Sequence, residues 1–320
     1  MGFVVRALGT LLLATPVAAQ ATRASSPTER DRALESAAAQ AAAGHPAEAA
    51  RLLRDAALRF HSVRALLQLS HLQTSQKDVV GALESLRQAR AIAPNSEEVL
   101  SAYAETSLAA HATLPALSAL DALTRLCPTV ARYRYLEGAA LTEVGDTAAA
   151  VEALKEAERL EPNQPLTLIA LGTALDGRQL YAEAKPYLLR ALSLGPDSVD
   201  AVAALAAAEE GLGELEAAEA HARRALATPS PPPAASLVVG MVRMKQDRCG
   251  EARDALLEAA AADPAAAKAH YELSLAYACL KDPARAQHHL EVYRQEIKER
   301  DERVRRVRSI TGFSEGAPPP

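Results

Sequence analysis

Apolar and polar residues repeat with a period of 34 residues over most of the chain. Copies of the pattern start at residues 63, 97, 131, 165, 199, 233 and 267, and no copy contains an insertion. Position 20 is alanine in every copy, position 24 is leucine in all but one, and position 8 is always serine, alanine or glycine. Proline stands at position 32 in five of the seven copies. Because alanine, leucine and proline share one frame, chance placement in an alanine-rich chain does not explain the period.

Each copy predicts two α-helices of about a dozen residues that pack closely together. A small residue at position 8 lets the second helix approach, with the alanine at position 20 facing it, and the leucine at position 24 fills the space between copies. Proline at position 32 ends the second helix because it cannot continue one. Turn residues such as Gly145, Gly213 and the segment 281–283 separate the two helices. The composition agrees with closely packed helices, because 49% of residues are hydrophobic and none is the bulky tryptophan.

A degenerate copy precedes these seven. Ala37, Gly44, Ala49, Leu53 and Ala56 occupy positions 8, 15, 20, 24 and 27 of a copy that starts near residue 30, and its linker is one residue short. The chain is therefore expected to hold about eight repeats. Their predicted ranges are 30–62, 63–96, 97–130, 131–164, 165–198, 199–232, 233–266 and 267–298. A proline-rich linker at 229–233 is expected to bend the array.

This pattern resembles the tetratricopeptide repeat family over about residues 63–296. The resemblance implies an all-α fold, a right-handed superhelix of antiparallel helix pairs. Two family columns differ: the tryptophan of position 4 is absent, and the tyrosine of position 11 survives only as Tyr277. The family's lysine at position 5 and asparagine at position 9, which hold acidic chain termini in some members, are missing from every copy, so that clamp is not expected.

The resemblance also implies which residues bind a partner. Positions 2, 5, 9 and 12 of each first helix face a concave groove in this family. The groove residues expected to bind a peptide or protein are Arg64, His71, Glu105, Arg132, Tyr135, Ile169, Thr173, Asp176, Glu210, Met241, Met244, Lys268, Tyr271 and Leu275. Four of them, Met241, Met244, Tyr271 and Leu275, are expected to form an exposed apolar patch.

The N-terminus is typical of an exported protein. Arg6 precedes an apolar run, and small residues follow it, which predicts a signal peptide at 1–21 and a mature chain that starts near Gln20–Thr22. The alternative is an uncleaved membrane anchor, although the apolar run is short of the roughly 20 residues that span a bilayer. Residues 22–29 are expected to be a disordered lead-in.

The C-terminus carries a charged helix at 299–312, followed by a disordered tail at 313–320. An apolar stripe accompanies it, formed by Leu290, Tyr293, Ile297, Val304 and Val307. One interpretation is a capping helix that covers the open end of the array, including the apolar patch. The other is a basic helix that binds a partner or a membrane surface.

No motif for catalysis, metal or cofactor binding stands out. The strings HExxH, CxxC, GxSxG and the phosphate-binding loop are absent, and Glu209 and Glu210 are read as a solvated helix face. The net charge of −5 gives no reason to expect nucleic acid binding. Cys249 and Cys279 are placed at the same edge of neighbouring helices, so they form either a disulfide or two unrelated core positions.

The sequence therefore predicts a non-catalytic scaffold, without cofactor or metal. It is expected to bind a peptide or protein segment in its concave groove, outside the cytoplasm, in the periplasm or as a secreted protein. The alternative is a structural or assembly subunit of a cell-envelope complex that acts through its convex face or its tail. The residues do not identify the partner.

Overall fold

A computed structural model describes residues 28–263 and 266–311, and the described residues are helical without a strand. The predicted all-α fold is therefore confirmed. The predicted signal peptide at 1–21 and the predicted disordered tail at 313–320 lie outside the described residues. None of the described helices is both long and apolar enough to cross a membrane.

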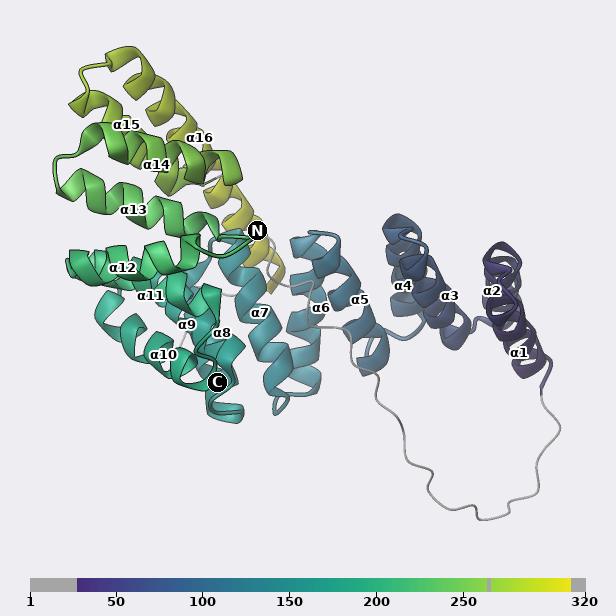
Figure 1. Ribbon diagram of the computed structural model, residues 1–320. Helices are drawn as coiled ribbons and strands as arrows, with labels where there is room; N and C mark the ends of the chain where they lie inside the picture. The colour runs from purple at the N-terminus through teal and green to yellow at the C-terminus, as the bar shows by residue number, and fades with distance from the viewer. Residues whose placement is uncertain (1–27, 264–265, 312–320) are drawn as a thin grey trace. The chain divides into compact units, whose positions relative to one another are not determined.

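The chain divides into two compact units between Pro128 and Thr129. In each unit, consecutive helices joined by short turns lie side by side (Figure 1). The first unit contains α1 (Glu29–Ala42), α2 (Pro46–Phe60), α3 (Val63–Ser75), α4 (Val79–Ile92), α5 (Glu97–Ala109) and α6 (Thr113–Leu126). The second contains α7 (Ala131–Val144), α8 (Thr147–Leu160), α9 (Pro165–Gly177), α10 (Tyr181–Leu194), α11 (Val199–Leu212), α12 (Leu215–Leu226), α13 (Pro233–Lys245), α14 (Cys249–Ala262), α15 (Ala267–Cys279) and α16 (Pro283–Thr311).

The first helix of every copy begins at the residue from which the 34-residue frame is counted, from Val63 to Ala267. Serine caps several of these starts, because its hydroxyl accepts a hydrogen bond from a backbone N–H that the helix leaves unpaired. Ser62, Ser96 and Ser198 each accept such a bond from the residue three positions on. The long linker before Pro233 does not separate the stack, since α12 and α13 still contact each other.

The turn inside each repeat has one fixed backbone shape. Position 15 adopts positive φ in all seven copies, although only two of the residues there are glycine: Lys77, His111, Gly145, Gln179, Gly213, Asp247 and Lys281. The backbone N–H of position 16 then donates to the carbonyl of position 11 at 2.8–2.9 Å in every copy. This bond satisfies a carbonyl at the end of the first helix and reverses the chain into the second.

Small residues set how closely the two helices of a repeat approach. A Cβ atom added to Gly172 would lie 2.5 Å from the Leu188 side chain, and one added to Gly240 would lie 2.5 Å from Leu256. These leucines occupy position 24, so the leucine packs on position 8 of its own repeat, where the sequence had suggested a contact between repeats. Position 20 is fully buried in six copies, as at Ala184, while Ala286 in the last copy is half-buried.

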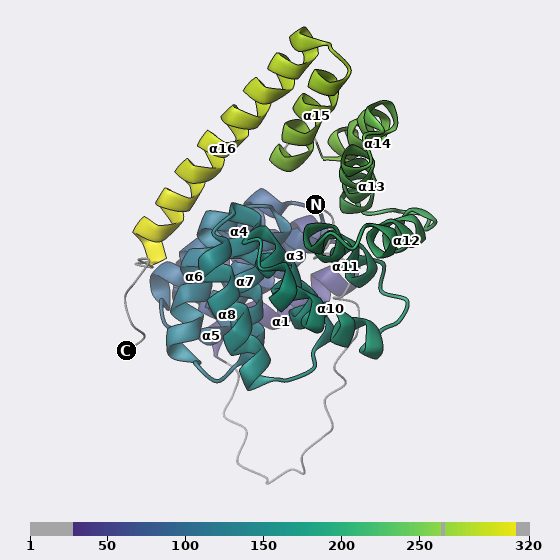
Figure 2. The same cartoon turned by 90° about the vertical axis from the view of Figure 1, so that its left-hand side faces the viewer.

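Two predicted boundaries are wrong. Thr28 and Glu29 belong to the first helix and its cap, where Thr28 and Asp31 bond each other's backbone, so the disordered lead-in cannot extend to residue 29. The repeat at 267–298 and the charged helix at 299–312 are not separate elements, because α16 is one uninterrupted helix past residue 298 (Figure 2). After Pro283 at its first position, the helix contains no proline or glycine that would end it earlier.

The far end of α16 docks on the turn between α7 and α8. Arg308 donates two hydrogen bonds to the buried carboxylate of Asp146, at 2.7 and 3.0 Å, and the neighbouring Val307 is 1% exposed. Arg300 lies so close to Gly145 that an added Cβ would meet its side chain at 2.6 Å. The helix therefore ties the last repeat of the second unit to the first repeat of that unit.

Replacing Ala184 with leucine should destabilise the second unit by about 1–3 kcal/mol, because a fully buried interhelical position has no room for a larger side chain. The exposed Ala182 on the same helix provides the control, since Ala182→Leu should leave the thermal unfolding midpoint unchanged. Equal midpoints for the two variants would show that position 20 does not limit the packing.

Asp146→Asn should release the end of α16, because asparagine still caps α8 but cannot carry the charge that Arg308 binds. A hydrogen bond to a charged group contributes about 1.5–3 kcal/mol to stability. A change of about 1.4 kcal/mol corresponds to about a factor of ten in the equilibrium constant for release of the helix end. Trypsin should therefore cut α16 near Arg300 about tenfold faster or more. Glu291→Gln, an exposed change on the same helix outside the docking hollow, should not alter the rate, and an unchanged rate for Asp146→Asn would contradict the docking.

Candidate binding groove

A cavity of about 410 Å³ opens on the second unit, between the turn after α9 and the helices α11, α13 and α15. Half of its lining consists of residues that the repeat pattern predicted for the groove: Glu210, Met241, Met244, Lys268 and Leu275. They meet because the same positions of successive first helices lie next to each other in a stack of repeats. The cavity is therefore built by three consecutive repeats and by the turn of the repeat before them.

The other half of the lining was missed by the sequence analysis. These residues are Gln179, Tyr181, Gly211, Lys245 and Glu272. Most of them stand at positions 13–17, from the last turn of the first helix to the first residue of the second, whereas the predicted groove positions are 2, 5, 9 and 12. Gly211 is required here, because a Cβ on it would lie 2.5 Å from the ring of Tyr181.

One wall of the cavity is apolar and partly accessible. Leu275 is 41% exposed and Met244 is half-buried. Met241 is only 8% exposed, so the expectation that it is an exposed anchor is wrong, although it does line the cavity. Tyr271 lies outside the lining, and its ring centroid is 5.2 Å from that of Tyr293 on α16.

The tail helix does not close this cavity. No residue of α16 lines it, and Val304 lies instead in a hollow beside Gly145 and Asp146, where α16 docks. The interpretation in which α16 covers the apolar patch is therefore wrong, because α16 contacts only Tyr271 of the patch and leaves it 40% exposed.

The other wall of the cavity is charged. Glu210 is 2% exposed, which contradicts its assignment to a solvated face, and Lys245 Nζ lies 2.6 Å from its carboxylate. Burial raises the pKa of Glu272, with Lys268 and Lys245 opposing the rise and Glu210 adding to it. Burial also raises the pKa of Asp176. Lys268 opposes this rise and Glu210 adds to it. The ionised forms of Glu272, in the lining, and of Asp176, outside it, therefore carry a free-energy cost that the neighbouring lysines only partly offset.

The remaining predicted groove residues do not reach this cavity. In the second unit they are Arg132, Tyr135, Ile169, Thr173 and Asp176, which lie on α7 and α9. Three others, Arg64, His71 and Glu105, belong to α3 and α5 of the first unit. The cavity thus brings together predicted residues only from the C-terminal repeats.

Two family models describe this chain, and both are models of the tetratricopeptide repeat. One matches residues 169–234 and 240–296, and the other matches residues 131–164. The matched segments follow the helix pairs from α7 to α16. The chain is a tetratricopeptide repeat protein.

Solved structures share the fold. A tetratricopeptide repeat protein from Parabacteroides merdae aligns with a TM-score of 0.58 at 16% identity, over 77% of this chain and 98% of the other. The Cut9–Hcn1 hetero-tetramer of the APC/C aligns with a TM-score of 0.57 at 16% identity, over 88% of this chain and 56% of that one. At this identity the likeness concerns the fold alone. No curated protein matches the sequence significantly.

A polar column departs from the aliphatic packing that this tetratricopeptide repeat sequence suggested. Position 11 is buried in every copy and carries Gln73, Ser107, Glu209 and Arg243 in four of them. Glu209 accepts from His221 at 2.7 Å, which makes it a paired core residue, not part of a solvated face. Gln73 pairs with Ser85 and Glu209 pairs with His221, in each case with a residue of the next helix, so these pairs hold neighbouring helices together.

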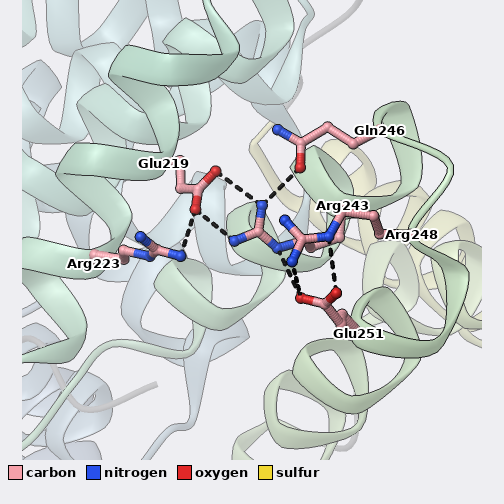
Figure 3. Close-up of polar contacts among 6 residues, drawn as sticks. All are labelled: Glu219, Arg223, Arg243, Gln246, Arg248 and Glu251. Carbon is pink, nitrogen blue, oxygen red and sulfur yellow. Dashed lines mark hydrogen bonds and ion pairs between the residues drawn. The ribbon is translucent and has the colours of Figure 1, made fainter.

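Arg243 is the centre of the largest of these pairings (Figure 3). It is 5% exposed, donates to Glu219 on α12 at 2.5 and 2.9 Å, and lies 3.5 Å from Glu251 on α14. The hydrogen bond from Arg243 lowers the pKa of Glu219. The guanidinium thus joins α12, α13 and α14, and Arg243 precedes the cavity-lining Met244 along α13.

A disulfide joins the start of α14 to the end of α15. The Cα atoms of Cys249 and Cys279 are 6.2 Å apart, within the usual range for such bonds. Cys127 is a free, partly buried cysteine of the first unit. Within the described residues, no group of three or more histidine, cysteine, aspartate or glutamate side chains is placed to hold a metal ion.

Proposed function

We propose that this chain is a non-catalytic scaffold that binds a segment of a partner protein in the groove formed by α11, α13, α15 and the turn after α9. Tetratricopeptide repeat proteins generally serve as protein-interaction scaffolds, which supports this class of function. The cavity at the predicted groove positions is the observation that carries the proposal.

The shape and the lining of the cavity favour a peptide segment. Side chains from successive repeats form its walls, so a ligand that contacts all of them extends along the stack. Met244 and Leu275 present accessible apolar surface between polar groups, which is typical of an anchor site for one large apolar side chain. We take the segment to be extended or helical.

We further propose that the scaffold acts outside the cytoplasm, in the periplasm or as a secreted protein. The N-terminal apolar run with its small-residue cleavage site supports export. The Cys249–Cys279 disulfide supports it independently, because such bonds persist mainly in oxidising compartments.

The alternative is a structural subunit of an envelope complex that uses its convex face or its tail. The docked contacts of α16 disfavour the tail, since Val307 is buried and Arg308 is already paired within this chain. The convex face remains the competing binding surface, and substitutions on each surface can show which of the two binds the partner.

Met244→Gln combined with Leu275→Gln should reduce capture of the partner from the protein's own cell-envelope extract by about tenfold or more, because the apolar anchor surface is lost. The control is Leu189→Gln with Leu257→Gln, on α10 and α14, whose side chains are 48% and 39% exposed and lie outside the cavity. Helical circular dichroism should be equal for both. Capture that survives the first pair and is lost with the second would move the site to the convex face.

The mature chain recovered from the cell envelope should start near Gln20–Thr22. N-terminal sequencing checks this directly, because cleavage of a signal peptide leaves a defined new end. Recovery of a chain that retains Met1 in the soluble cytoplasmic fraction would contradict export.

A further inference from the structure

Three histidines gather where the two helices of the last repeat meet. His270 lies on α15, and His288 and His289 lie on α16, which runs alongside α15 (Figure 2). The half-buried ring of His289 stacks on Tyr277 at a centroid distance of 5.5 Å and on His270 at 5.2 Å. This cluster is part neither of the cavity lining nor of the docked end of α16, so it acts on the contact between α15 and α16.

Two ring nitrogens of this cluster face each other and limit how many protons it can hold. The Nδ1 atoms of His270 and His289 lie 3.0 Å apart, which is a hydrogen-bond distance. Such a bond needs one nitrogen that carries a hydrogen and one that offers a lone pair. When both rings are imidazolium, two N–H groups point at each other and repulsion between like charges replaces the bond. The contact therefore persists only while at least one of the two rings is neutral.

The surroundings of His289 favour its neutral form. Burial lowers the pKa of His289, and the charges of His270 and His288 lower it further. Because this pKa lies below the value of about 6.5 in an unfolded chain, the neutral ring contributes stability that is complete above about pH 6.5 and is lost as the pH falls below it. The titratable and charged groups around the pair come from three helices: Tyr277 of α15, Arg285 and His288 of α16, and Asp263 at the C-cap of α14.

The pair lies at the end of α15 that contributes to the groove. His270 is in the first turn of α15, and the cavity-lining residues Lys268 and Glu272 each stand two positions from it. The opposite end of α15 is fixed, because Cys279 is bonded to Cys249 at the start of α14. Loss of the contact at His270 therefore loosens the end of the helix that carries Lys268 and Glu272, while the disulfide holds the other end.

We propose that the pair of His270 and His289 is a pH-sensitive contact, which holds the start of α15 against α16 at neutral pH and opens in acid, so that the bound segment is released. The release rests on the proposed function, whereas the opening is a property of this chain alone. Because a histidine in the open form titrates near pH 6.5, uptake of one proton makes opening about tenfold more favourable at pH 5.5 than at pH 7.5.

Amide hydrogen exchange of the mature protein measures the opening, with His270→Gln and His289→Gln combined as the comparison. Glutamine keeps a polar side chain at both positions but does not titrate, and comparison at one pH cancels the pH dependence of the intrinsic exchange rate. The ratio of wild-type to variant exchange at residues 267–274 should be about tenfold higher at pH 5.5 than at pH 7.5. His45→Gln, which removes an exposed histidine of the first unit, is the control and should exchange there as the wild type does.

Calorimetry measures the release, with a peptide selected from a random displayed library on the immobilised mature protein at pH 7.5. Only the closed form provides the complete groove, so the apparent affinity falls with the closed fraction. The dissociation constant should therefore rise about twofold or more from pH 7.5 to pH 5.5 in the wild type, since it doubles once the open form equals the closed one. It should stay constant in the double glutamine variant.

The outcomes separate the inference from the proposed function. An exchange ratio that is equal at the two pH values would overturn the opening and leave the groove intact. Faster exchange with an affinity that does not change with pH would overturn the release. If no peptide is enriched, the proposed function and the release fail together, and the exchange ratio still decides the opening.

A measurement on the wild type alone covers the case in which the double variant does not fold. Nuclear magnetic resonance of the histidine ring protons should show that His289 takes up its proton well below pH 6.5, the ordinary value of about 6.5 being that of an exposed ring. Titration of both His270 and His289 near that ordinary value would reject the pair as a pH-sensitive contact.

Discussion

A leucine packed directly on a residue that has almost no side chain is the contact on which the rest of this structure depends. In three repeats of the second unit the small residue is glycine, and a single added methyl group would meet the leucine of the same repeat at about 2.5 Å. Interiors are packed too densely to absorb such an overlap without displacing a helix. Since each helix pair positions the next one, the spacing of the first helices, and with it the width of the groove, follows from this contact.

Much of this arrangement could be predicted from the sequence, because the contact recurs in phase. The frame placed the starts of the first helices, from Val63 to Ala267, at the residues where the structure has them. The turn residue at position 15 was less visible, since lysine, histidine, glutamine and aspartate adopt positive φ there as well as glycine. The turn is imposed by the helices on either side of it, and side-chain identity is only a weak signal for it.

The polar pairs and the docked end of α16 could not be predicted from the sequence, for a different reason. Arg243 donates a hydrogen bond to Glu219, which lies one repeat earlier, and Arg308 donates one to Asp146, which lies 162 residues earlier. No local sequence pattern links such distant partners. Burial at one repeat position also differs from copy to copy. Met241 and Leu275 both occupy position 9, yet one is 8% exposed and the other 41%, because each depends on its own neighbours. The groove positions were therefore predictable, while the accessible subset of them was not.

The central claim is that the first-helix side of α11, α13 and α15 forms the binding surface of the second unit. Amide hydrogen exchange, with and without a peptide selected on the mature protein, tests it most directly, because it shows where the bound ligand slows the opening of the backbone. The account predicts protection at the turn after α9, at the last turns of α11 and α13, and along α15 around Lys268, Glu272 and Leu275. Protection confined to α10, α12 and α14, with the exchange of the first helices unchanged, would contradict it.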